Sequence, residues 1–287
     1  MDNPPPPTAP APESVPLPAA ARTTLRGILA EEPNWIGIHA AEALLETGDS
    51  AWVRQFLLDR LARSDASPFR VGPWRVLART AVTPEERARW VARIEAVVVD
   101  PAAPDRVAAL ESLAKLDHRL GAAGRDFARR LAGDPREAET LIPLWALALA
   151  GEPDALGRIR LALRSPEPIA RRRAGYVLRW LRVTDPAILA ELARAADAEP
   201  PGTDIHAFLV SAALQRRADP ARLTAWQRQL EDIILTGITI SRYEACQALA
   251  GRCPPTTLAQ LAPLLASKEG DVRIGAALVI LSAGQAR

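Results

Sequence analysis

The stretch that decides the fold lies near the C-terminus and reads Asp271-Val-Arg-Ile-Gly-Ala-Ala-Leu-Val-Ile-Leu281. Its apolar residues Ile274, Ala277, Leu278 and Leu281 recur at intervals of three and four, the spacing of one face of an α-helix. Its paired alanines are small enough to let a neighbouring helix approach closely. The stretch therefore predicts an amphipathic helix that packs tightly against another helix.

Similar segments recur along the chain at intervals of 35, 36, 32, 31, 35, 38 and 30 residues. Segments with longer side chains fill the intervals between them, while alternating β-branched runs, the usual signal of strands, are missing. A fixed period with two helices per unit is the signature of an α-solenoid, because each pair must stack on its neighbours to bury its apolar faces. The sequence predicts an all-α array of about eight helix pairs. The repeated segments begin at Asn34, Phe69, Asp105, Glu137, Pro168, Thr203, Ser241 and Asp271.

The Asp-Val-Arg-x-x-Ala-Ala-x-x-x-Leu pattern of 271–281 resembles the second helix of a HEAT repeat, especially the short bacterial form. Residues 36–48 and 169–181 match this pattern more loosely. The resemblance implies an armadillo-type, right-handed α-solenoid of antiparallel helix pairs in a bacterial protein. This family is a scaffold with many uses, so the resemblance alone does not choose a function.

The chain divides once. Residues 1–19 hold eight of the 26 prolines, and proline lacks the amide donor that helices and sheets require. We expect a disordered, proline-rich tail there and a HEAT-like α-solenoid over 20–287. A docking motif for a proline-binding module is the alternative for the tail.

The composition excludes several classes of protein. An apolar content of 48% with 24% charged residues is typical of a folded globular chain. No apolar run approaches the length of a membrane span, and no secretion signal precedes the fold, so a cytoplasmic location is expected. The two cysteines, Cys246 and Cys253, exclude a disulfide scaffold, and no zinc or phosphate-loop motif is present, so neither a metal nor a cofactor is predicted.

In HEAT-like arrays the second helix of each pair lines a concave groove. Aligning these helices on their small residues predicts which side chains face it. The first repeats place charges of both signs there, and the middle repeats place aromatic rings, a combination that suits a binding cleft. Packing of the tryptophans between repeats is the alternative. The predicted groove-binding residues are Arg79, Trp145, Arg173, Tyr176, Trp180 and Gln247.

His39 and Glu42 lie three residues apart and therefore share a helix face. Such a pair can serve general acid–base chemistry, and Arg75, Glu111 and Lys115 of adjoining repeats are candidate members of the same site. Glu42, Arg75 and Glu111 are expected to form a ladder of alternating charge. Some HEAT-like enzymes build iron sites from repeated His-Glu pairs, but a single pair predicts no metal. A structural role for a partly buried His39 is the alternative.

Arginine clusters in one block, Arg158–Arg182, which carries eight arginines against the single acid Glu167, or +7 over 25 residues. Such a patch attracts phosphate or an acidic partner. Within it, Arg171, Arg172 and Arg179 are the candidate polyanion-binding residues. Arginine supplies 34 of the 36 basic residues in the chain, a bias typical of GC-rich genomes. Part of the arginine enrichment therefore reflects codon usage, which makes the cluster weaker evidence for a binding site.

Three functions remain open. The first is a scaffold that holds a protein or peptide partner along the groove. The second is an enzyme with an acid–base site around His39, Glu42, Arg75, Glu111 and Lys115. The third is a nucleic-acid-binding protein that uses the arginine block.

Overall fold

The computed structural model describes residues 16–63, 69–134 and 141–283. Within these ranges every regular element is a helix, and sixteen α-helices pack in neighbouring pairs, which confirms the all-α prediction. The elements in chain order are α1 (Leu17–Glu31), α2 (Trp35–Glu46), α3 (Ser50–Arg63), α4 (Val71–Thr80), α5 (Pro84–Val99), α6 (Arg106–Lys115), α7 (Ala122–Gly133), α9 (Ile142–Leu149), α10 (Pro153–Ala162), α11 (Pro168–Trp180), α12 (Pro186–Ala198), α13 (Asp204–Arg216), η1 (Pro220–Arg222), α14 (Leu223–Thr236), α15 (Thr239–Leu249), α16 (Pro255–Leu261), η2 (Ala262–Ala266) and α17 (Gly270–Ser282).

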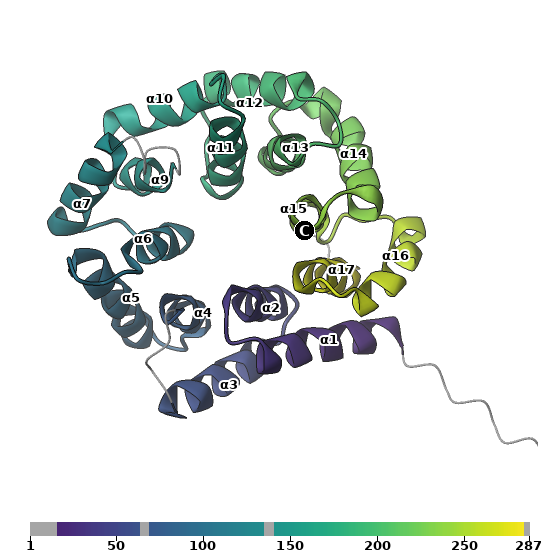
Figure 1. Cartoon of the computed structure of the whole chain (residues 1–287), viewed down its shortest axis with the longest axis horizontal. Coiled ribbons are helices and arrows are strands. Elements are labelled where there is room, and N and C mark those ends of the chain that lie inside the picture. The colour runs from purple at the N-terminus through teal and green to yellow at the C-terminus, as the bar shows by residue number, and fades with distance from the viewer. Residues whose placement is uncertain (1–15, 64–68, 135–140, 284–287) are drawn as a thin grey trace, which may run out of the picture.

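The helices form two concentric layers, as Figure 1 shows. The segments rich in small residues form the inner layer, and the segments with longer side chains form the outer layer. Burial follows this division: nine of the 13 residues of inner helix α13 are buried, but only Ala155 and Ile159 of outer helix α10. The inner helices are α2, α4, α6, α9, α11, α13, α15 and α17.

The array closes into a ring. Helix α17 packs against both α1 and α2, so the two ends of the chain meet (Figure 1). The sequence predicted a concave groove and did not predict this closure. The inner helices therefore face a central space surrounded by the chain, and the contact of α17 with α1 and α2 is the seam of the ring.

Several inner helices begin and end at residues suited to these positions. The Asn34 side chain accepts a hydrogen bond from the backbone of Ile36 at the start of α2, and Thr203 caps α13 in the same way. Gly48 and Gly151 follow α2 and α9 with positive φ angles, which glycine adopts without steric cost. These signals explain why the periodic segments end where the sequence suggests.

Helix α1 begins at Leu17, three residues before the start of the fold that the sequence predicted. Pro18 lies in the first turn, where the amide that proline lacks has no partner within the helix and is not needed. Residues 1–15 of the predicted tail lie outside the described part of the chain.

Inner helices α11 and α13 lie close together. A Cβ atom added to Gly175 would lie 3.0 Å from the backbone carbonyl carbon and oxygen of Phe208. The backbone of α13 cannot move aside as a flexible side chain can. The missing side chain of Gly175 therefore permits the close contact between α11 and α13.

We expect Gly175→Ala to destabilise the fold by about 1–3 kcal/mol, because overpacking outweighs the better helix propensity of alanine. Gly157→Ala in outer helix α10 is the matched control, since nothing lies within 4 Å of a Cβ added there. This variant should gain about 0.5–1 kcal/mol from propensity alone. Urea unfolding of both variants checks the prediction, and a gain of stability in both would contradict the close contact.

Candidate functional site

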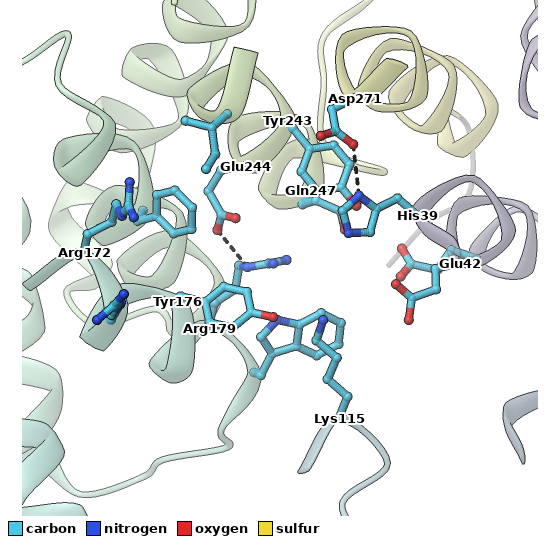
Figure 2. A pocket seen from close by; sticks show the side chains of 15 residues that line it. His39, Glu42, Lys115, Arg172, Tyr176, Arg179, Tyr243, Glu244, Gln247 and Asp271 are labelled. Atoms are coloured by element: carbon cyan, nitrogen blue, oxygen red, sulfur yellow. Dashed lines mark hydrogen bonds and ion pairs between the residues drawn. The ribbon is translucent and has the colours of Figure 1, made fainter. Parts of the chain in front are cut away.

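A pocket of about 280 Å³ lies among the inner helices. Its lining residues come from α2, α6, α11, α13, α15 and α17, and thus from both ends of the chain and from its middle. Figure 2 shows polar and charged side chains from these helices directed toward the same space. The closure of the ring therefore assembles the pocket, because α2 and α17 contribute to one wall.

His39 lies at this wall and is held by residues from the far end of the sequence. Its Nδ1 atom is 2.9 Å from Oδ1 of Asp271, and its ring stacks on Tyr243 with the centroids 4.9 Å apart. The His39 side chain retains 27% of its exposure. Asp271 and Tyr243 thus fix both the plane and the direction of an imidazole that ligands can reach (Figure 2).

The sequence spacing suggested a pair between Glu42 and His39, but Glu42 instead pairs with Arg75. Its carboxylate accepts a hydrogen bond from Nε of Arg75 at 2.9 Å, and Arg75 donates a second one to Oγ of Ser112 at 2.9 Å. Burial alone would raise the pKa of Glu42, but the positive charges of Arg75, Lys115 and Arg79 lower it to about 2. Glu42 is therefore an ionised carboxylate whose charge is balanced by its neighbours.

The predicted charge ladder is only partly formed. Glu42 and Arg75 are in contact, but Glu111 accepts hydrogen bonds from the hydroxyl of Tyr176 and from Lys115, whose Nζ lies 2.9 Å away. Burial would raise the pKa of Glu111, and Lys115 and the Tyr176 hydroxyl reverse the effect and lower it to about 2. Burial, reinforced by Glu111, raises the pKa of Tyr176, so this residue carries a neutral hydroxyl.

Aromatic rings surround the ammonium group of Lys115. Its Nζ lies 5.2 Å from the ring centroid of Trp180 and 5.5 Å from that of Tyr176, within the range of cation–π attraction. Burial lowers the pKa of Lys115, and the nearby Glu111 opposes this shift. Lys115, Tyr176 and Trp180 together make a wall that offers both positive charge and apolar surface.

A buried ion pair joins α11 to α15 at the pocket. Nε of Arg179 lies 2.7 Å from Oε1 of Glu244, and the side chains are only 7% and 2% exposed (Figure 2). Burial raises the pKa of Glu244, although the charge of Arg179 counteracts it. This pair links α11, which carries Tyr176 and Trp180, to α15, which carries Tyr243.

The arginine block is not a free cationic surface. Arg171 makes a bidentate contact with Glu199 at 2.8 and 2.9 Å, and Arg172 pairs with Asp204 at 2.5 Å. The sequence count of +7 considered only the block itself and missed these acids, which come from other segments. The neutralised charge weakens the case for a polyanion site at Arg171, Arg172 and Arg179.

Most predicted site residues line the pocket, but several do not. Trp145 is 1% exposed and packs between Trp180 and Tyr176, each with ring centroids 6.3 Å away, so it belongs to the core. Arg75 is 2% exposed and supports Glu42 from behind. The predicted residues in the pocket lining are His39, Glu42, Lys115, Arg172, Arg173, Tyr176, Arg179, Trp180 and Gln247, whereas Arg75, Arg79, Glu111, Trp145 and Arg171 lie outside it.

Three important lining residues were not among the predicted sites, namely Asp271, Tyr243 and Glu244. Their helices carry the same repeat pattern as α2, and Glu244 falls in one of the aligned columns. Only the closure of the ring brings Asp271 to His39, and the repeat spacing contains no signal for this closure. The seam is therefore the part of the site that sequence reasoning missed.

A second histidine, His118, also pairs with a carboxylate. The sequence has no acidic residue three or four positions from His118, and its Nε2 instead lies 2.8 Å from Oε1 of the distant Glu95 in α5. The pair lies outside the pocket lining, although the exposure of His118, at 25%, is close to that of His39.

Among the residues that the structure describes, no three histidine, cysteine or acidic side chains are grouped so as to hold a metal ion. The helices within the described ranges also lack the combination of length and apolar content needed to cross a membrane.

Comparison of the chain with protein-family models, with curated proteins and with solved structures gives no match. The functional conclusion therefore depends on the chemistry of the pocket itself.

Proposed function

We propose that this protein is an enzyme that acts on a small molecule in the central pocket, with His39 as the group that accepts a proton. The observation that carries this proposal is the contact between His39 and Asp271 across the seam. With Nδ1 donating its proton to Asp271, the neutral imidazole keeps the lone pair of Nε2 for a ligand. A carboxylate in this position also stabilises the imidazolium that forms when the proton is taken.

The surroundings of His39 support a role beyond packing. Tyr243 holds the imidazole plane, so the ring need not lose rotational freedom when a ligand binds. Across the pocket, Tyr176 and Trp180 offer aromatic faces and Lys115 offers positive charge. An oriented base beside convergent polar and aromatic groups is the usual composition of an active site.

The helix pairs are proposed to be HEAT-like repeats, wound with the right-handed sense that this family implies. Binding of a protein or peptide along a concave groove is the second candidate function. The aromatic and charged lining favours it, but the contacts of α17 with α1 and α2 leave a pocket of only about 280 Å³, too small for an extended chain. Such a partner would insert a single side chain or a terminus. Nucleic-acid binding is disfavoured by the ion pairs of Arg171 and Arg172.

The test is the conversion of a metabolite mixture by the purified protein, followed by mass spectrometry. We expect the native protein to convert at least one component and His39→Gln to slow this by about 10²–10⁴-fold, the usual contribution of a general base. The matched control is His118→Gln, which removes a similarly exposed histidine–glutamate pair outside the pocket. It should convert the component at the native rate.

Both variants must melt within a few degrees of the native protein for the comparison to hold. Equal rates for native protein and His39→Gln, or no conversion by any of the three proteins, would contradict the proposed function.

A further inference from the structure

The pocket is polarised. Arg172 and Arg173 on α11 supply positive charge to one part of its lining, and Lys115 on α6 supplies another cation. Glu42 and Glu46 on α2, together with Asp271 on α17, supply negative charge around His39. Figure 2 shows Arg172 on the side of the pocket opposite Glu42 and Asp271. Arg172 and Arg173 thus lie apart from the carboxylates around His39, whereas Lys115 is close enough to Glu42 to help lower the pKa of that carboxyl.

The charges of the lining also balance. The lining holds four cations, Lys115, Arg172, Arg173 and Arg179, and four carboxylates, Glu42, Glu46, Glu244 and Asp271, so their charges sum to zero. Their ion-pair partners outside the lining, Arg75, Arg79, Glu111 and Asp204, add two charges of each sign and leave the sum unchanged. The Arg179–Glu244 pair joins α11 to α15 and cancels internally. A ligand with a net charge would leave one unbalanced charge in the pocket. A ligand that is neutral overall but carries separated charges matches both walls.

The remaining lining is apolar. Tyr176, Trp180, Phe208, Ile240 and Tyr243 contribute aromatic or aliphatic surface to the same pocket. Burial raises the pKa of Tyr243, so its hydroxyl stays neutral like that of Tyr176. Such surface favours an apolar group between the charged ends of the ligand. The cavity volume of about 280 Å³ is slightly below the 300–1,000 Å³ typical of pockets for drug-sized ligands. A cavity of this volume suits a small metabolite.

We infer that the ligand of the central pocket is a small zwitterion, an amino acid or close analogue with an apolar or aromatic side group. Its carboxylate faces Arg172, whose guanidinium keeps N–H donors beyond the one that binds Asp204, and its ammonium group faces Glu46 and Asp271. The inference rests on the proposed function and names the substrate class of that site. It also places the ammonium group beside His39, the residue proposed to accept a proton.

The experiment measures binding of the proteinogenic amino acids to the full chain by calorimetry. The tightest binder is then compared with its decarboxylated amine and its deaminated acid, which share its side group but carry one charge each. We expect the zwitterion to bind at least tenfold more tightly than either analogue, because each analogue leaves one charged wall without a partner. Equal affinity for the zwitterion and one analogue, or no binding by any amino acid, would overturn the inference.

Two variants locate the ends of the ligand. Arg172→Gln should weaken binding of the zwitterion and the acid but leave the amine unaffected, whereas Glu46→Gln should weaken the zwitterion and the amine but leave the acid unaffected. Both side chains are partly exposed, at 27% and 22%, so neither change removes a buried charge. A uniform loss for all three probes in both variants would contradict the polarity that we assign.

The same measurement separates this inference from the proposed function. Selective zwitterion binding to native protein and to His39→Gln, without conversion by either, would support the ligand class and reject the proton transfer. Conversion of a singly charged molecule that depends on His39 would support the proton transfer and reject the ligand class.

Discussion

Arg75→Gln is expected to lower the free energy of unfolding by about 3–5 kcal/mol, the usual cost of breaking a buried ion pair by removing one partner. Arg75 is 2% exposed and holds Glu42 and Ser112 at once, each at 2.9 Å. Glutamine is shorter and uncharged, so Glu42 would keep its burial and lose its principal counter-charge. The large effect follows from the carboxylate left behind rather than from the strength of the pair itself.

Arg79→Gln is the matched control for this variant. Arg79 lies one turn further along α4, 3.7 Å from the same Glu42 carboxylate, but its side chain is 28% exposed. Exposed pairs contribute about 0–1 kcal/mol, so the control should remain close to the native stability. Urea unfolding of both variants decides the matter. Equal and small losses would show that Glu42 does not depend on Arg75.

The effect of Arg75→Gln should depend on pH. In the native protein the pKa of Glu42 is lowered to about 2, so its stabilising contribution is complete above the ordinary carboxyl pKa and is lost only as pH falls toward 2. In the variant, burial acts with less opposition and the pKa rises. Protonation then relieves the buried charge, so the stability difference between the two proteins should shrink as pH falls from neutral toward about 4.

The repeat pattern predicted the helix layers because it depends on local spacing. Small residues such as Ala40 and Ala276 mark the inner layer, where helices must lie close together. The same reasoning placed His39, Tyr176 and Gln247 in the pocket, since residues at one column of the aligned helices share one face. These predictions needed only the helical period.

The errors arose where a side chain's depth depends on its neighbours. Trp145 occupies a column that was expected to face the groove, but its ring fills the space beside Trp180 and is fully buried. Arg75 was expected to be an exposed step of a charge ladder, but its guanidinium reaches inward to Glu42 and Ser112. Column alignment gives the direction of a side chain and not the space available to it.

The contact between His39 and Asp271 could not be predicted, because 232 residues separate them. Whether an array of helix pairs closes depends on the small rotation from each pair to the next, summed around the ring. No single residue encodes that sum. The site therefore became visible only with the three-dimensional arrangement of α2, α15 and α17.

Ending the chain after Ser267, which removes α17, should abolish cooperative folding. Within α17, Val272, Ile274, Leu278, Val279, Ile280 and Leu281 are all buried. At about 1.5–3 kcal/mol for each large aliphatic side chain, their burial contributes on the order of 10 kcal/mol, comparable with the whole net stability of a typical protein. A chain that ends after Ala283 keeps α17 and should unfold like the native protein.

The truncation also distinguishes a ring from an open array. In an open array each unit contacts only its neighbours, so loss of the last helix would leave the first helices unaffected. In the ring, α17 covers α1 and α2 as well as α15, so its removal exposes helices from both ends of the sequence. Circular dichroism during urea unfolding measures cooperativity, and hydrogen exchange locates the exposed helices. Faster exchange in α1 and α2 is expected in any truncated chain that stays folded, whereas native protection of both helices would show that the seam contributes little to stability.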